Sequence, residues 1–553
     1  MPHNQIWRWN SETIWQKYCG FLDLNRQEFG QIQQELLLDE IATVHNSPLG
    51  RRLLRGSKPQ SVDEFRRVVK LTKYGDYLPD LEDGNDASLP EPAYHWVHTT
   101  GAKAEYKHIP YTRRGYDVVA DNVMAAFILS CANKKGEVNI ALGNRVLYNT
   151  PPRPFLSGML TFEMADRFGF PGVLDPWDAE GMEFKERIER GFRRGLVTGV
   201  DILVSMSSIL VKIGEEFANR QKKSSFSPEM LHPAAISRLG AAYLKRKLLR
   251  RDLLPKDLWS PKAILAWGID APFFKSQVEH YWGKTPFQFY SCTEGGVMAL
   301  QGWNKKGMTL VPYSNFFEFI PEEESIRSWD DTEYSPTTLL TDELEEGKRY
   351  EIVITHFHGM PLMRYRVGHL IRVLSLEDPE TGVKLPQIEF EARCDDRIDL
   401  AGFTRMDEKT FWEALTDAQV GCADWIVRKE PTGDKPKLHL YGEFKGELNE
   451  KEITQVIDQA LKDKDPFYND LEEMLGIFPL KVTRLSEGTF DRYYDAQLRK
   501  GLPLTERRPS RLNATNASVA ELLHLSDAAT APTRQLSDLP RVEVVGAGSA
   551  RVS

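Results

Sequence analysis

Four separated segments of the chain carry side chains that could bind phosphate, a metal ion or a carboxylate. The first is HTTGAKAEYKHIPYT, residues 98–112, which combines hydroxyls, a glycine and lysines in a turn between two expected strands. Backbone N–H groups and lysine ammonium groups in such a turn could cradle an anion. Taken alone, the same composition is more typical of a polar surface loop.

The second segment, QFYSCTEGG, follows an expected strand and ends in two glycines. Tyr290 could pack against a base, Thr293 could contact a phosphate, and Glu294 could hold a hard cation. Proteins bind Mg²⁺ through one or two carboxylates together with the phosphate oxygens of a ligand. An ordinary strand end with a polar turn explains the same residues about equally well.

The third and fourth segments are rich in charge. In MPLMRYRVGHLIRV, Arg364 and Arg366 alternate on an expected strand, so both guanidinium groups would point to one face. They could bind an anion together, although without context a surface ion-pair ladder is the favoured interpretation. The fourth segment, EARCDDRIDLAGFTRMDE, suits either a hinge between two domains or an ordinary charged linker.

An α/β framework is expected to position these segments. The chain to about residue 70 has helical patterns, and from about 94 to 311 strands such as AILAWGI and PFQFYS alternate with helices at 200–217 and 233–250. This alternation predicts a layered α/β body with a partly parallel sheet. A β-rich stretch follows, with the expected strands MTLVPYSNFFEFIP, RYEIVITHFHG, HLIRVLSL and PQIEFEAR.

A smaller α+β domain is expected beyond residues 393–396. Its predicted helices are 408–415, 451–461 and 491–498, and its predicted strands are LHLYGEF and FPLKVTRL. From about residue 514 the composition is typical of a tail without its own core, although ASVAELLHL could form a short docking helix. We therefore expect a large domain over residues 1–392, a mobile lid over 393–512 and a tail over 513–553.

In this order the segments resemble the motifs of the acyl-adenylate-forming superfamily. Within it, the chain is most similar to the auxin-responsive acyl acid amido synthetases and their microbial homologues. TTGAKAEYK falls on the phosphate loop, YSCTE on the Y-x-x-T/S-E motif, RYRVGH on the YRxGD motif and RCDDRID on the hinge motif. DPFYND and EGTFDRYYDAQLRKG are similar to the C-terminal domain, so the resemblance spans about residues 30 to 511.

The resemblance implies an ATP-dependent ligase that uses Mg²⁺, forms an acyl-adenylate from a carboxylic acid and passes the acyl group to an amine such as an amino acid, or to a thiol. Cations would offset the negative charge that gathers during transfer. The residues implied for the nucleotide are Thr99, Thr100, Gly101, Lys103, Lys107, Tyr290, Ser291, His369 and Arg393. Those implied for the chemistry are Thr293, Glu294 as the Mg²⁺ ligand, Arg366 and Arg508, with Asp395 as the hinge. The acyl site is expected to draw on residues 200–213 and on Trp267, Gly268 and Asp270.

Three places depart from the family's motifs. Ala102-Lys103-Ala104 stands where relatives have two hydroxyls and a glycine, His369 replaces a ribose-binding aspartate, and Arg508 falls near a lysine position. Losing a charged hydrogen-bond acceptor costs about 1.5–3 kcal/mol, part of which a neutral imidazole could recover. These departures keep open a second hypothesis, in which the fold is retained and the ATP chemistry is altered or lost.

Under that hypothesis, Cys292 could be a thiol nucleophile in a nucleotide-independent acyltransferase or hydrolase, with His356, His358 or His369 as base. A cysteine at a strand end is more often a small buried side chain. The three histidines could instead bind Zn²⁺. A non-catalytic binding protein is the third class, and the presence of Glu294 argues against it.

Composition bounds the cellular context. The 553 residues carry 71 Lys+Arg against 80 Asp+Glu, a net charge of -9, which argues against a general nucleic-acid binder. Five scattered cysteines indicate a reducing compartment, and the longest apolar stretch, residues 200–213, is too short to span a membrane. We expect a cytoplasmic enzyme with small-molecule partners, without nucleic acid or membrane; the pattern leaves its oligomeric state open.

Overall fold

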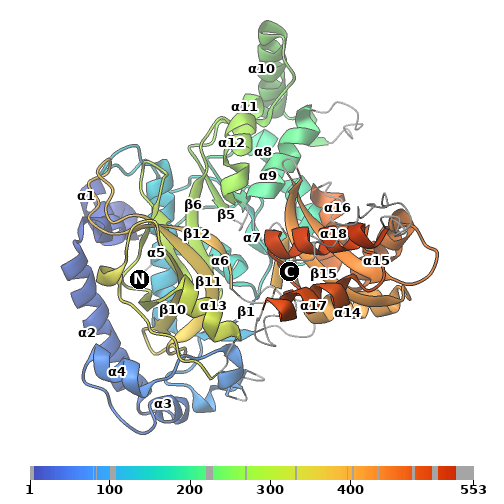
Figure 1. The fold of residues 1–553 in the computed structure, drawn as a ribbon. Helices are drawn as coiled ribbons and strands as arrows, with labels where there is room; N and C mark the ends of the chain where they lie inside the picture. Colours follow the sequence, from blue (N-terminus) through green and yellow to red (C-terminus); the bar gives the residue numbers. More distant parts are fainter. Residues whose placement is uncertain are drawn as a thin grey trace, which may run out of the picture. The chain divides into compact units, whose positions relative to one another are not determined.

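The computed structural model describes residues 5–78, 80–81, 84–99, 107–182, 184–218, 228–267, 271–330, 333–394, 397–400, 404–432, 435–475, 480–500 and 509–530. The chain forms two compact units (Figure 1). Unit 1 comprises Met1–Phe411, Lys429–Lys437 and Leu461–Pro479, and unit 2 comprises Trp412–Arg428, Leu438–Ala460 and Leu480–Ser553. The domain boundary expected at residue 392 stays a prediction.

A ten-stranded mixed sheet is the scaffold of unit 1, with the order β3-β4-β5-β6-β7-β8-β12-β11-β10-β9. Four neighbouring strands run parallel: β3 (Val146–Asn149), β4 (Ile202–Met206), β5 (Ala263–Trp267) and β6 (Phe287–Cys292). The other six pair antiparallel: β7 (Gly296–Gln301), β8 (Met308–Leu310), β9 (Asn315–Pro321), β10 (Arg349–His356), β11 (Tyr365–Ser375) and β12 (Gln387–Arg393). The predicted α/β class with a partly parallel sheet and a β-rich continuation is confirmed.

Helices connect the parallel strands, as crossovers between parallel strands require. They are α6 (Leu156–Asp166), α7 (Pro176–Ala179), α8 (Phe184–Thr198), α9 (Ser207–Ala218), α10 (Pro233–Leu249), α11 (Pro255–Leu258) and α12 (Ala271–Trp282). The single helix predicted over residues 200–217 is wrong, because β4 occupies its first part and α9 begins only at Ser207. A short apolar run does not distinguish a buried strand from a buried helix by its periodicity.

The remaining elements of the large body lie before and within the sheet. The expected helical start contains α1 (Ser11–Cys19), α2 (Arg26–Val44), α3 (Pro48–Leu53) and α4 (Val62–Val68), followed by the hairpin of β1 (His95–His98) and β2 (His108–Tyr111). Helix α5 (Arg113–Cys131) packs against β5 and β7, and α13 (Glu322–Asp330) follows β9. Helix α2 stops before Pro48, which begins α3 with Ser47 as its N-cap. Short 3-10 helices occupy Gln5–Arg8, Gly20–Asp23, Tyr74–Tyr77, Asp86–Ser88, Pro228–Leu231 and Thr341–Glu343.

The C-terminal part of the chain mixes strands and helices. Its elements are β13 (Arg397–Leu400), β14 (Thr404–Asp407), α14 (Glu408–Asp417), β15 (Cys422–Thr432), β16 (Lys435–Phe444), α15 (Glu450–Lys464), α16 (Pro466–Leu475), β17 (Leu480–Arg484), α17 (Thr489–Arg499) and α18 (Asn516–Thr530). Unit 2 centres on the sheet β15-β16-β17, in which β16 and β17 are parallel. The predicted strands and helices of this region are present, whereas β15 and α16 were not predicted.

Helix α18 lies where the sequence favoured a tail without a core. Its Val519 and Leu522 join a buried cluster with Phe490 and Tyr493 of α17. The alternative interpretation, a docking helix at ASVAELLHL, therefore describes this stretch. The residues after Thr530 lie outside the described part of the chain.

Candidate active site

A cavity of about 550 Å³ opens at the carboxyl ends of the four parallel strands. The residues that line it include Thr150 after β3, Met206 at the end of β4, Trp267 at the end of β5, and the run from Gln288 to Glu294 on and after β6. In open α/β sheets, ligands bind in the crevice outside the carboxyl ends of the strands, and the volume falls in the ordinary range for small-molecule sites. The fold therefore identifies this cavity as the candidate active site.

Much of the cavity wall is apolar. It includes Phe127 of α5, Leu160 and Met164 of α6, Val204 of β4, and Trp267. Two predictions for the acyl pocket are consistent with this wall, since Trp267 and two residues from the 200–213 stretch line the cavity. The other predicted acyl residues, Gly268 and Asp270, lie outside the described residues.

The turn between β6 and β7 forms the polar end of the cavity, and three buried side chains hold its backbone. Three successive carbonyl oxygens accept hydrogen bonds: Thr293 O from the Tyr111 hydroxyl (2.7 Å), Glu294 O from His356 Nε2 (2.5 Å) and Gly295 O from Asn315 Nδ2 (2.8 Å). Burial raises the pKa of Tyr111, which keeps its hydroxyl a donor. The turn that presents Thr293 and Glu294 is thus fixed from β2, β9 and β10.

His356 serves this turn and not a metal. The Leu362 N–H donates to its Nδ1 (3.2 Å), so the ring proton sits on Nε2, which donates to the Glu294 carbonyl. Burial lowers the pKa of His356 to about 4, which keeps the ring neutral. His358 directs its Nε2 to the Tyr313 carbonyl (2.9 Å). The three-histidine zinc hypothesis is therefore wrong, and within the described ranges no group of three His, Cys, Asp or Glu side chains is placed to hold a metal ion.

The Glu294 carboxylate forms an ion pair with Lys107, which belongs to the first segment, residues 98–112. The Lys107 ammonium lies 2.8 Å from Glu294 Oε1 and 2.9 Å from the Tyr365 hydroxyl, and it also faces the rings of Tyr74 and Tyr365 at 5.8 and 5.6 Å. Glu294 is 7% exposed. A cation–π arrangement and an ion pair together hold the lysine in place.

Two backbone hydrogen bonds close the base of the predicted phosphate loop. The Thr99 N–H donates to the Lys107 carbonyl (3.1 Å), and the Lys107 N–H donates to Thr99 Oγ1 (3.2 Å). Thr100, Gly101 and Lys103, which the motif implies for phosphate binding, lie outside the described residues. The described part of the loop thus links Lys107 to Glu294, while its contact with phosphate stays a prediction.

A tyrosine–histidine pair forms another wall of the cavity. The Tyr290 hydroxyl lies 2.9 Å from His369 Nδ1, and both rings pack against Phe390. His369 follows Gly368, whose φ of +73° and neighbouring register shift mark a bulge in β11. Because Tyr290 engages Nδ1, a ribose hydroxyl would have to be bound through Nε2. The predicted adenine and ribose roles of this pair remain predictions.

The two arginines of the third segment do not share an anion, so that interpretation is wrong. Arg364 has a φ of +46° and precedes β11, which breaks the expected alternation. Its guanidinium pairs with Glu318 of β9, whereas Arg366 forms two hydrogen bonds to Glu351 of β10 (2.8 and 2.5 Å). Both ion pairs are buried, and Arg366 does not line the cavity. The structure gives Arg366 a supporting position between strands.

Cys292 lines the cavity beside Ser291, and its Sγ accepts a hydrogen bond from the Gly295 N–H (3.2 Å). Two of the histidines considered as its base are bonded to backbone carbonyls, as described above. Three further predicted residues fall where the structure describes no side chain: Arg393, Asp395 and Arg508.

Two family models match the chain. Residues 308–393 match the GH3 family central domain, and residues 409–516 match the GH3 family C-terminal domain. This part of the chain, residues 308–516, is thus similar to the central and C-terminal domains of the GH3 family. This agrees with the acyl acid amido synthetase resemblance of its motifs.

Curated relatives of the chain match over part of their length. Jasmonoyl–L-amino acid synthetase GH3.5 of Oryza sativa subsp. japonica is 25% identical over 296 residues, which is 48% of each chain. The GH3 domain-containing protein of Homo sapiens is 27% identical over 210 residues, covering 35% of this chain and 37% of the human protein. The matches thus span about half or less of these relatives.

Solved structures show the same fold over nearly the whole chain. The structure titled AtGH3.15 acyl acid amido synthetase in complex with 2,4-DB has a TM-score of 0.51 and 16% identity, covering 93% of this chain and 97% of that one. A 2-hydroxyisobutyryl-CoA ligase in complex with 2-HIB-AMP and CoA has a TM-score of 0.50 and 14% identity, covering 89% and 92%. At these identities the likeness establishes the fold.

Sequence reasoning missed the groups that hold the site together. Tyr111, Asn315 and Tyr365 were not predicted to act there, and His356 was considered only as a base or zinc ligand. Tyr365 lies within RYRVGH, so the motif offered a signal for it. Tyr111 lies at the end of the first segment and Asn315 begins β9, but nothing in the local sequence shows that either side chain reaches the turn after β6.

Proposed function

We propose that this protein is an ATP-dependent ligase that activates an apolar carboxylic acid as an acyl-adenylate and transfers the acyl group to an amine, such as an amino acid. One observation carries the proposal. A fixed turn bearing Thr293 and Glu294 meets an apolar chamber at the carboxyl ends of parallel strands. A phosphate-binding end and an acyl end within one cavity are what adenylation of an apolar acid requires.

The side chains at the polar end of the cavity would each neutralise or bind a different part of the nucleotide. Lys107 and Thr293 would contact the phosphates, and the Lys107 charge would offset the negative charge that develops as the carboxylate attacks the α-phosphate. The fixed backbone of the turn would keep these groups in place without rearrangement at the moment of reaction. The buried carboxylate of Glu294 suits Mg²⁺, which takes one carboxylate plus phosphate oxygens and would supply further charge neutralisation. Lys107 would then exchange its partner, from Glu294 to phosphate.

The chamber favours acids with an aromatic or long aliphatic body. Phe127, Leu160, Met164 and Val204 offer no charge, so a carboxylate would be driven toward the polar end and the apolar body toward the chamber.

The amine acceptor is proposed from the relatives, whose names include jasmonoyl–L-amino acid synthetase. Rotation of the C-terminal lid about Asp395, with Arg508 entering for the second step, belongs to the same proposal. None of the five cysteines forms a disulfide in the structure, which supports a cytoplasmic location.

Acid-dependent ATP–pyrophosphate exchange tests the first step directly. We expect exchange with Mg²⁺ across a panel of aromatic and fatty acids, and its loss in Glu294→Gln. Glu12→Gln, at an exposed position of α1, is the matched control and should keep full exchange. A labelled acid whose acyl group is transferred to amino acids but not to CoA would identify the acceptor as an amine.

Absence of exchange with every acid, in a folded protein, would refute adenylation. Hydrolysis of an activated acyl ester without ATP, lost in Cys292→Ala, would establish the thiol alternative instead. Exchange that survives Glu294→Gln would show that Mg²⁺ is held elsewhere.

A further inference from the structure

Helix α10 projects from unit 1 and is covered on one side only (Figure 1). Its inner face packs against α8, α11 and the Pro228–Leu231 turn. Ala235 and Ala242, seven residues apart on that inner face, are completely buried. These contacts hold one side of the helix, while other side chains of the helix are exposed.

The outer face carries large apolar side chains. Ile236, Tyr243, Leu244 and Leu248 are 54%, 58%, 67% and 84% exposed. Their spacing of i, i+7, i+8 and i+12 places them on one stripe of an α-helix. Leu231, just before the helix, extends the apolar surface and is 63% exposed. Four large apolar side chains exposed on one helix are an unusual concentration on a protein surface, and such apolar surface is typical of an interaction site.

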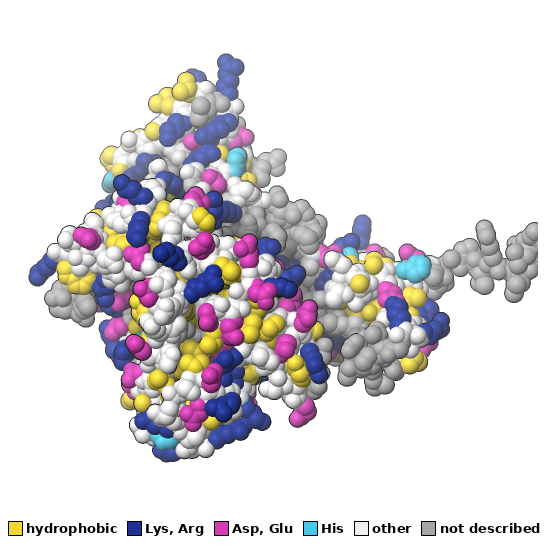
Figure 2. Space-filling view, turned by 60° about the vertical axis from the view of Figure 1, so that its left-hand side comes forward, with side chains coloured by type: hydrophobic (Ala, Val, Ile, Leu, Met, Phe, Trp, Pro, Cys, Tyr) yellow, Lys and Arg dark blue, Asp and Glu magenta, His cyan; other side chains and the backbone are white. Residues whose placement is uncertain are grey.

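Positive charge borders this stripe. Helix α10 contains four basic and no acidic residues in PAAISRLGAAYLKRKLL, although the chain as a whole carries a net charge of -9. Lys245, Lys247 and Arg250 are exposed. Figure 2 shows hydrophobic and basic side chains gathered at the same projecting tip.

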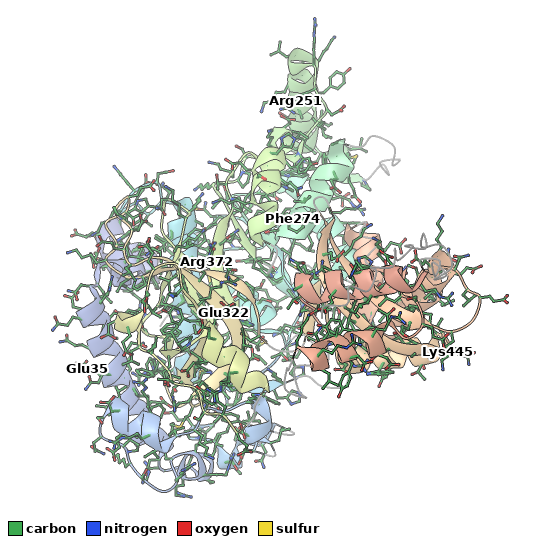
Figure 3. All side chains as sticks on the ribbon, viewed as in Figure 1. Glu35, Arg251, Phe274, Glu322, Arg372 and Lys445 are labelled. Carbon is green, nitrogen blue, oxygen red and sulfur yellow. The ribbon has the colours of Figure 1, made fainter. Side chains whose placement is uncertain are left out.

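Arg238 within the helix and Arg251 just after it have structural partners. Arg238 donates to the carbonyls of Leu196 and Val197, and Arg251, marked in Figure 3 near the end of α10, pairs with Asp257. The charge presented to a partner therefore comes mainly from the lysines and Arg250.

We propose that α10 docks this protein on an anionic membrane surface. The apolar stripe would enter the boundary between headgroups and acyl chains, and Lys245, Lys247 and Arg250 would contact lipid phosphates. A helix with apolar residues on one face and Lys/Arg around it lies in the interface plane. It would not cross the bilayer: among the described residues, no helix is long and apolar enough to do so.

The geometry favours a lipid surface over two protein partners. An acidic protein that wraps an amphipathic helix needs access around it, and the inner face of α10 is covered by its own chain. A second copy of this chain, packed face to face, would bring one basic patch against another, since a two-fold interface uses the same patch on both copies. A bilayer contacts only the outer face and supplies the opposite charge.

Vesicle cosedimentation of the full-length chain tests the docking, independently of any catalytic activity. We expect binding to phosphatidylcholine vesicles that contain phosphatidylserine, weaker binding at high salt, and little binding to phosphatidylcholine alone. Each basic residue near an anionic surface contributes roughly fivefold in affinity, so Lys245→Gln/Lys247→Gln should weaken binding about 25-fold. Leu244→Gln/Leu248→Gln should weaken it by more than about tenfold.

Matched variants elsewhere on the surface provide the controls. Lys58→Gln/Lys134→Gln removes the same charge from exposed positions, and Leu142→Gln removes an exposed leucine (53%). Both should bind as the unaltered chain does, and thermal melts should show all variants folded.

Three outcomes would overturn the proposal. They are no binding to anionic vesicles, equal loss in the control variants, or equal binding to neutral and anionic vesicles. If the α10 variants instead abolish self-association in sedimentation velocity, or binding to an acidic protein such as calmodulin, without changing vesicle binding, the patch serves a protein partner and the proposal fails.

Discussion

Replacing Arg366 should lower the free energy of unfolding of unit 1, because the Glu351 carboxylate would be left buried without its partner. The Glu351 side chain is fully buried and that of Arg366 is 5% exposed. The pair is joined by two hydrogen bonds, and Ser325 donates a further one to Glu351. Breaking a buried pair by removing one partner costs about 3–5 kcal/mol.

The double variant separates this structural role from a catalytic one. Arg366→Met/Glu351→Leu removes both charges and keeps similar volumes, and such replacements are often neutral or stabilising. We therefore expect each single variant to be strongly destabilised and the double variant to recover most of the loss. Arg372→Met, on the same strand and labelled in Figure 3, is the control, because its pair with Glu389 is solvent-exposed and should contribute less than about 1 kcal/mol.

Urea denaturation followed by tryptophan fluorescence measures the effect. With a slope of roughly 3 kcal/mol per molar urea, the Arg366→Met midpoint should fall by about 1–1.7 M. An unchanged midpoint together with lost pyrophosphate exchange would refute this reasoning. It would place Arg366 in contact with substrate, as the motif resemblance implies.

Three other predictions follow from buried groups. Burial raises the pKa of Glu40 to about 8 from 4.5, so the folded chain keeps a proton that the unfolded chain loses, and stability falls as pH rises between these values; Glu40→Gln should raise the melting temperature more near pH 8 than near pH 5. The pKa of His356 is lowered to about 4 from 6.5, so stability is lost as pH falls between these values; His356→Gln should reduce that loss in the same melts. Leu522 is fully buried in the cluster of α17 and α18, and Leu522→Ala should destabilise unit 2 by about 2–5 kcal/mol, seen as faster limited proteolysis.

Each of these three predictions has an outcome that would contradict it. A Glu40→Gln advantage that does not grow with pH would mean that this carboxyl is already ionised in the folded chain. An acid melting curve unchanged by His356→Gln would assign the acid sensitivity to other groups. A proteolysis rate that Leu522→Ala leaves unchanged would mean that the packing of α18 does not stabilise unit 2.

Much of the fold could be predicted because its signals are local. The strands β5, β6, β10 and β12 are short runs of apolar and β-branched residues that the sequence predicts directly. The failures occur where local patterns are ambiguous. Residues 202–206 are apolar enough for either a strand or a helix, and the apolar side of α18 becomes visible only against α17.

The site divides in the same way. The motifs marked the turn after β6 and His369, and the structure places both in the wall of the cavity, while their roles stay predictions. They did not reveal that the turn is held by Tyr111, Asn315 and His356, because those contacts span 182, 20 and 62 residues of sequence. Arg366 was misjudged for the same reason, since its partner Glu351 belongs to the neighbouring strand.

The ten-stranded sheet changes from parallel to antiparallel pairing at β6, and this division has a consequence for how the site can change by mutation. The acid chamber is built mostly from ends of the parallel strands and from α5 and α6, while the donors that hold the Glu294 turn come mainly from the antiparallel side and the β2 hairpin. Mutations at Val204 or Leu160 can therefore reshape the chamber without loosening that turn. Under the proposed function, a change of acid would require changes in the chamber alone, while the turn that bears Glu294 keeps its support.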